Sequence, residues 1–203
     1  MTGTRVPGVP FALQESEPWP WRTTPTGVEV SAKPCSDLFV DPSGQGGIAA
    51  QSLMNAVTLL GTPPAGDFTL TARVQVQFTQ TFDAGVLLIW ADERHWAKLC
   101  FEYSPQGEAM VVSVVTRELS DDANGFLVPA DRVWLRIARI DDVWAFHAST
   151  DGKVFSFIRA FNLGVSAPQI GFEAQSPNGQ ECDVRFSDVA FTATRLGDLR
   201  DGS

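Results

Sequence analysis

An all-β fold, with antiparallel strands arranged as a sandwich or a barrel, is predicted by three observations on this 203-residue chain. Residues 68–78 alternate between apolar and polar side chains, as a strand with one buried face does. Turn sequences such as Asp151-Gly152 recur at intervals of about ten residues. No long stretch has the apolar spacing of an amphipathic helix. Fourteen Phe and six Trp residues supply large rings for a sandwich core.

The N-terminal part is expected to be less regular than the rest. Residues 1–16 are expected to form an irregular arm. A single domain is expected to span residues 17–193, and its first residues, 17–22, are stiffened by Pro and Trp side chains. Val28–Ala32 is a short predicted strand. Glycines at 44, 46 and 47 indicate a loop. Residues 48–60 fit either a short helix or a loop followed by a strand.

The remaining chain reads as consecutive strands that end in a mobile tail, residues 194–203. After 68–78, strands are predicted at 85–91, 95–103, 110–117, 132–140, 143–149, 155–160, 169–174 and 181–192. The side chains expected to be buried between two sheets are Phe68, Leu70, Val74, Val76, Leu87, Ile89, Leu99, Phe101, Leu135, Ile137, Phe172 and Phe186.

The strand at 95–103 carries the clearest functional signal. Its odd positions from Ala97 to Tyr103 form an apolar face. Its even positions, Trp96, Lys98, Cys100 and Glu102, combine a large aromatic ring with a cation and an acid. A sheet face that carries aromatic and charged side chains, opposite an apolar face that packs in the core, is suited to binding a ligand.

Composition and charge exclude several function classes. The formal net charge of -9 argues against nucleic acid and against an anionic membrane surface as partners. The N-terminus has no apolar signal segment, and no apolar run approaches the ~20 residues of a membrane helix. Cys35, Cys100 and Cys182 share no metal-ligand spacing and fit free thiols. A cytoplasmic location is therefore expected, although a secreted form lacking its signal stays open.

Several short motifs occur in an order that resembles a known family. They include Asp37-Leu-Phe-Val-Asp-Pro42, Phe82-Asp-Ala-Gly85, Asp92-Glu-Arg-x-Trp-x-Lys-x-x-x-Glu102, Ser149-Thr-Asp-Gly152 and Val184-Arg-Phe-Ser-Asp188. The family is a bacterial and fungal one known as domain of unknown function 1349, or "regulation of enolase"-like, and the resemblance covers roughly residues 17–192. It implies a jelly-roll sandwich of the concanavalin A-like lectin and glucanase type, with a concave face on one sheet, and it leaves the activity open.

The chain departs from the family pattern near the expected concave face. Phe82 replaces the usual Tyr, and Cys100 replaces the usual Gly. Asp122 stands where an aromatic residue is common. These changes in bulk indicate a ligand preference different from that of its relatives.

A ligand site is expected on the concave face, with Trp96 or Trp90 stacking on a sugar or another flat ligand. The polar groups expected to anchor the ligand are Lys98, Glu102, Arg117, Arg136 and Glu173. The alternative is a ladder of exposed charges across the sheet, without a ligand.

Two functions follow from these residues. A non-catalytic binder of a carbohydrate or a similar polyhydroxy ligand is favoured because the paired-carboxylate motif of the glucanases is missing. The alternative is a cofactor-independent cyclase, isomerase or lyase that uses the same pocket, with Glu102, Lys98 and Glu173 as catalytic candidates. His95 and His147 are expected to be structural, since neither lies near a nucleophile elbow.

No metal or cofactor is expected. The only sets of oxygen ligands suited to calcium are Asp121-Asp-Ala-Asn124 and Asp37 with Asp41, and solvated loops explain both. No glycine-rich phosphate loop is present. A small molecule or a carbohydrate is the expected partner, and the chain is either a monomer or a homodimer.

Overall fold

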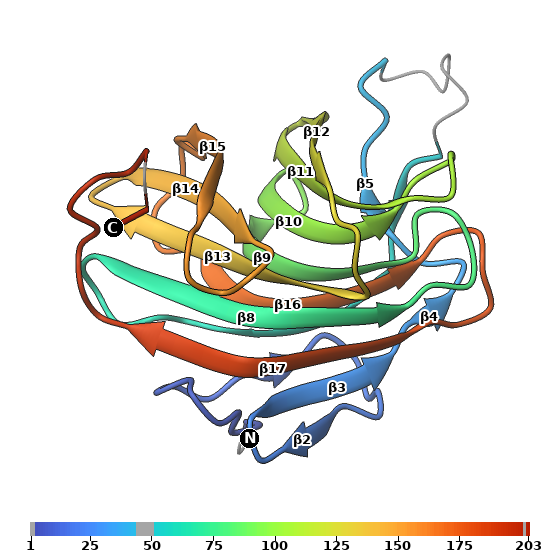
Figure 1. Ribbon diagram of the computed structural model, residues 1–203, viewed down its shortest axis with the longest axis horizontal. Helices are drawn as coiled ribbons and strands as arrows, with labels where there is room; N and C mark the ends of the chain where they lie inside the picture. The colour runs from blue at the N-terminus through green and yellow to red at the C-terminus, as the bar shows by residue number, and fades with distance from the viewer. Residues whose placement is uncertain (1–2, 44–50, 201) are drawn as a thin grey trace.

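Two β-sheets pack face to face and enclose the main apolar core (Figure 1). The structure, a computed structural model, describes residues 3–43, 51–200 and 202–203, and these residues contain no helix. The predicted all-β sandwich with antiparallel sheets is confirmed. No helix in this described part has the length and hydropathy of a membrane-spanning segment.

The first sheet has eight strands, which are antiparallel except for one short parallel partner of β16. In spatial order they are β1 (Gln14–Glu15), β7 (Val57–Gly61), β16 (Gln169–Ser176), β9 (Ala84–Asp92), β10 (His95–Tyr103), β11 (Ala109–Arg117) and β12 (Leu119–Leu127), with β4 (Lys33–Pro34) beside β16.

The second sheet is antiparallel and has seven strands. In spatial order they are β15 (Ser156–Phe161), β14 (Val143–Ser149), β13 (Arg132–Ile140), β8 (Phe68–Gln77), β17 (Asp183–Thr192), β3 (Gly27–Ser31) and β2 (Arg22–Thr24). A separate two-stranded ribbon consists of β5 (Leu38–Phe39) and β6 (Leu53–Met54).

Alternation within the strands builds the core as predicted. All twelve side chains expected between the sheets are buried there. Phe172 of the first sheet packs against Phe186 of the second, with ring centroids 4.8 Å apart. The other face of the first sheet carries a second apolar cluster, which includes Trp96, Cys100 and Leu38. The functional question concerns this second face.

Two segments differ from the sequence-based expectations, and a third agrees with one of its two alternatives. Residues 119–127, expected to include a solvated loop at Asp121–Asn124, form the edge strand β12; most of its side chains are exposed, so no apolar alternation marks it. The described part of 48–60 contains β6 and most of β7, which agrees with the alternative of a loop followed by a strand and not with a helix; residues 48–50 lie outside the described residues. The N-terminal arm buries Val6, Val9 and Leu13 in the main core.

The C-terminal segment also packs against the sandwich, where a mobile tail was expected. Its Leu199 carbonyl lies 2.7 Å from His147 Nε2 on β14. Arg136 on β13 donates a 2.6 Å hydrogen bond to the carbonyl of Gly202. Arg195 is paired with both Asp67 and Asp141, at 2.9 and 3.0 Å. The segment therefore covers the outer face of the second sheet.

Candidate functional site

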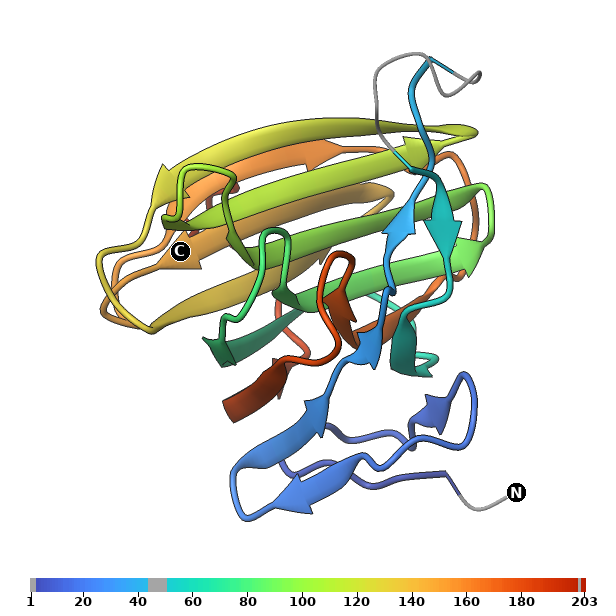
Figure 2. The same cartoon turned by 90° about the vertical axis from the view of Figure 1, so that its right-hand side faces the viewer.

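The ribbon, residues 37–40 and 53–55, crosses the face of the first sheet that points away from the core. Figure 2 shows its light-blue and teal strands in front of the green strands of this sheet. Asp37 reaches Lys98 on β10, with Oδ1 and Nζ 2.7 Å apart. Val40 exchanges two hydrogen bonds with Ser120 on β12. The ribbon is thus fastened to strands in the middle and at the edge of the sheet.

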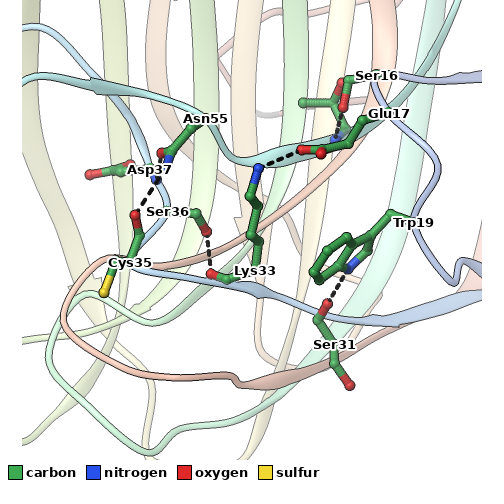
Figure 3. Close-up of polar contacts among 10 residues, drawn as sticks. Ser16, Glu17, Trp19, Ser31, Lys33, Cys35, Ser36, Asp37 and Asn55 are labelled. Atoms are coloured by element: carbon green, nitrogen blue, oxygen red, sulfur yellow. Dashed lines mark hydrogen bonds and ion pairs between the residues drawn. The ribbon is translucent and has the colours of Figure 1, made fainter.

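A single asparagine holds the two arms of the ribbon together at their base (Figure 3). Asn55 Oδ1 accepts a 3.1 Å hydrogen bond from the Asp37 backbone N–H. Its Nδ2 donates to the carbonyl of Cys35, also at 3.1 Å. This bridge fixes the start of the ribbon, so that the Asp37 carboxylate is aimed at Lys98.

Lys98 is the central cation beneath the ribbon. Only 2% of the residue is exposed, and its ammonium donates to Asp37 Oδ1 at 2.7 Å and to Gln175 Oε1 at 2.8 Å. Burial alone would lower the pKa of Lys98, but the carboxylates of Asp37 and Glu173 outweigh burial and raise it. The side chain is therefore charged at every physiological pH, and Asp37 is its direct counter-ion.

Glu173 is the most unusual side chain of this face. It is completely buried, and neither carboxylate oxygen has a hydrogen-bond partner in the described structure. Burial raises its pKa to about 8, against the opposing effect of Lys98 and with a further contribution from Asp37. An unpaired carboxyl in this position costs stability, which is a common feature of functional sites.

Glu102 is the second acid of the face, and it is only partly buried. Burial also raises its pKa to about 8, with Lys98 opposing the shift and Asp37, Asp122 and Glu173 adding to it. Burial likewise raises the pKa of Asp122 on the edge strand β12. Lys98, Glu102 and Glu173 are therefore close enough to influence one another, as the sequence-based hypothesis required.

Trp96 lies on the predicted face but is not available to a ligand. Its side chain is fully buried in the second apolar cluster, and its ring lies 5.9 Å from Lys98 Nζ. The prediction that the Trp96 ring is exposed for stacking is wrong. The ribbon covers this part of the sheet, and its Leu38 packs in the same apolar cluster as Trp96. The indole Nε1 has no hydrogen-bond partner in the described structure.

The two arginines proposed for the site lie elsewhere. Arg117 follows Val111 and Val115 in the alternation of β11, which points it toward the second sheet, and its Nη1 donates to the carbonyl of Asn162. Arg136 belongs to the second sheet and stacks on Phe155, with its guanidinium carbon 3.5 Å from the ring centroid. For Arg136, the error arises because strand alternation cannot show on which sheet a residue lies. Arg117 lies on the same sheet as Lys98, but the alternation of β11 places it on the opposite, core-facing side.

A pocket of about 270 Å³ opens beside the ribbon on the same face. Trp90, another candidate from the sequence, lines it together with Gln169, its partner on β16. Leu38 and Met54 of the ribbon form an apolar wall. The other polar side chains of the lining are Gln14, Glu15, Ser16, Thr58 and Glu93. This pocket, and not the strip above Trp96, offers a partly exposed ring to a ligand.

Sequence reasoning missed Asp37 and Gln175 beside Lys98. It also missed the polar residues of the pocket other than Trp90, which are Gln14, Glu15, Ser16, Thr58, Glu93 and Gln169. Gln169 and Gln175 share the alternation of Glu173 on β16, so their placement on this face could have been predicted. Asp37 was noted within a motif and, with Asp41, as a candidate calcium ligand, and nothing in the sequence brings it to Lys98. Among the described residues, no group of three or more His, Cys, Asp or Glu side chains is placed to hold a metal ion.

Comparisons with known proteins support the fold. A family model described as a protein of unknown function, DUF1349, matches residues 15–194. Among curated proteins, no sequence matches the chain significantly. A functionally unknown protein from Saccharomyces cerevisiae has a similar structure, with a TM-score of 0.78 and 23% identity over 90% of this chain and 96% of that one.

Two further similar structures are a GH43 protein and a carbohydrate-binding module. The GH43 BlXynB protein from Bacillus licheniformis matches with a TM-score of 0.62 and 12% identity, over 82% of this chain but 33% of its own. The carbohydrate-binding module CBM66 from Bacillus subtilis matches with a TM-score of 0.53 and 13% identity, over 85% of this chain and 90% of its own. At these identities, the likeness concerns the fold alone.

Proposed function

The chain belongs to the DUF1349 family of proteins of unknown function, and from its own side chains we propose that it binds a carbohydrate or a similar polyhydroxy ligand without transforming it. The pocket beside the ribbon carries this proposal. It combines the aromatic surface of Trp90 with side-chain amides and hydroxyls that can pair with sugar hydroxyl groups. Its volume of about 270 Å³ suits a small ligand or the end of a larger one.

The chemistry of the lining favours a sugar over a purely apolar ligand. Trp90 presents a ring for stacking, and Gln14 and Gln169 each offer donors and an acceptor. Ser16 Oγ already accepts a hydrogen bond from the backbone of Thr58, so its position is fixed before a ligand arrives. A GH43 glycoside hydrolase and a carbohydrate-binding module share the fold, which is consistent with this choice.

A glycan array followed by titration calorimetry tests the proposal. Trp90→Ala is expected to weaken binding of an array ligand by about 1–3 kcal/mol, the scale of an aromatic anchor. Trp134→Ala, which removes a partly exposed tryptophan from the second sheet, serves as the matched control and is expected to leave the affinity unchanged. The proposal is wrong if no glycan binds, or if the two variants bind equally well.

The buried acids favour a second candidate function, a cofactor-independent enzyme. Glu102 is partly exposed and its pKa of about 8 suits a general acid at neutral pH. Under this alternative, Glu102→Gln abolishes turnover of an array ligand but retains its binding. Product analysis after prolonged incubation separates the two functions, because a binder leaves the glycan intact.

A further inference from the structure

The pocket beside the ribbon is lined by acidic side chains and by no basic ones. Its lining contains two acids, Glu15 and Glu93, and no lysine, arginine or histidine. Glu93 makes no hydrogen bond or ion pair with any residue in the described part of the chain. Glu15 accepts only a long hydrogen bond, 3.4 Å, from the backbone of Trp19. Both carboxylates are therefore free to interact with a ligand.

The basic groups at the turn after β9 and beneath the ribbon do not neutralise these acids, because each of them is already paired. Arg94, next to Glu93 in the chain, is 2.9 Å from Glu118, and His95 is 3.0 Å from Asp92. Lys33 and Lys98 are likewise paired, with Glu17 at 2.8 Å and with Asp37 at 2.7 Å. The pocket thus keeps an uncompensated negative potential beside an aromatic ring.

A further acid lies at the same face, one strand away from the pocket wall. Thr58, which lines the pocket, is the cross-strand partner of Glu173. Glu173 is fully buried and both of its oxygens lack partners among the described residues. Glu173 does not itself line the pocket, so the charge that a ligand meets directly is that of Glu15 and Glu93.

We propose that the ligand carries a protonated amine, which makes an amino sugar the ligand class of this pocket. The ammonium group would lie over the Trp90 ring and within reach of the Glu15 and Glu93 carboxylates, where cation–π and ionic attraction add to each other. This inference rests on the proposed carbohydrate binding and excludes phosphorylated sugars and sugar acids, which the same carboxylates repel.

Three trisaccharides of equal length separate the charge from the sugar: β-1,4-linked glucosamine, its N-acetylated form and β-1,4-linked glucose. Titration calorimetry at pH 6, where the amine is protonated, is expected to give about tenfold tighter binding for the glucosamine form. Raising the salt concentration is expected to weaken binding of this form only.

Paired variants locate the charge effect. Glu15→Gln/Glu93→Gln is expected to reduce the preference for the amine to about twofold or less. Glu108→Gln/Glu181→Gln removes the same charge from two exposed glutamates outside the pocket and is expected to preserve the preference. Circular dichroism verifies that both variants are folded.

Each contrary result has a distinct meaning. The inference is overturned if the acetylated or the glucose form binds at least as tightly as the amine, and carbohydrate binding then still stands. It is also overturned if the pocket variant keeps the full preference. If none of the three trisaccharides binds, the inference fails, while the glycan array decides the proposed function separately.

Discussion

Lys98 and Glu173 are both buried on the same face of the first sheet, but they differ in their hydrogen-bond partners. The lysine has two hydrogen-bond partners, Asp37 and Gln175, whereas the carboxyl of Glu173 has none in the described structure. Replacing either residue alters the balance of buried charge beneath the ribbon. The protonation of Glu173 is therefore linked to folding, with a direction that can be worked out.

The stability of the protein is expected to fall as the pH rises from about 4.5 to about 8. The pKa of Glu173 is near 4.5 in an unfolded chain and about 8 in the folded protein. Below this range both states hold the proton and the stabilisation is complete. Within it, only the folded state keeps the proton, so each rise in pH favours unfolding. The pKa of Glu102 is shifted in the same direction.

Urea unfolding at a series of pH values measures this effect. The wild-type protein is expected to lose a few kcal/mol of unfolding free energy between pH 5 and pH 8. Glu173→Gln is expected to lose clearly less, because the titrating group is gone, and exposed Glu108→Gln serves as the control. An unchanged pH slope in Glu173→Gln would contradict the assignment of a buried, unpaired carboxyl.

Trp96→Ala is expected to destabilise the protein by about 3–5 kcal/mol, because a fully buried indole leaves a large cavity. Leu99→Ala, on the opposite face of the same strand, is expected to cost about 2–5 kcal/mol. Val154→Ala is a control at a side chain that is 73% exposed. Thermal unfolding measures all three. A Trp96 variant as stable as the control would show that the ribbon does not cover this ring.

The ribbon and β12 show why the site was harder to predict than the strands around it. β5 and β6 are each two residues long, too short for a periodic pattern, and they are fastened to the sheet by residues remote in sequence. β12 is polar and exposed, so its alternation carries no signal. Both elements frame the candidate site, and neither can be recognised by hydrophobic periodicity.

The C-terminal segment is an element whose removal has two measurable effects. Deleting residues 195–203 breaks the contacts to His147 and Arg136, and a modest loss of about 1–2 kcal/mol in unfolding free energy is expected. Burial lowers the pKa of His147 and outweighs the opposing effect of the hydrogen bond to Leu199, so losing both is expected to raise this pKa.

Nuclear magnetic resonance of the two imidazoles follows this deletion directly. The resonances of His95, at the turn before β10, serve as the internal reference because His95 contacts Asp92 and not the C-terminal segment. If the His147 titration is unchanged by the deletion, the segment does not cover the second sheet in solution.

At the scale of the whole molecule, the sandwich itself was predictable because a two-residue period fully specifies which side chains enter the core. The strand at His95–Tyr103 was predicted to the residue, and both of its faces were assigned correctly. The burial of its outer face beneath the ribbon was not predictable, because the alternation within a strand does not show which other segment covers that face. The prediction for Arg136 failed because the assignment of strands to sheets is a property of topology. The prediction for Arg117 failed because this residue continues the core-facing alternation of Val111 and Val115.

Residues 37–40 cross the sheet from Lys98 to Ser120, and this crossing limits the length of a ligand that can lie on the sheet. An unobstructed sheet of this width would be a platform along which a polymer could lie at any point of its length. Here the platform is interrupted, and the pocket on one side of the interruption is small. Under the proposed carbohydrate binding, such a surface is suited to binding a chain end, a side branch or a free monosaccharide, and not the interior of a long unbranched polymer.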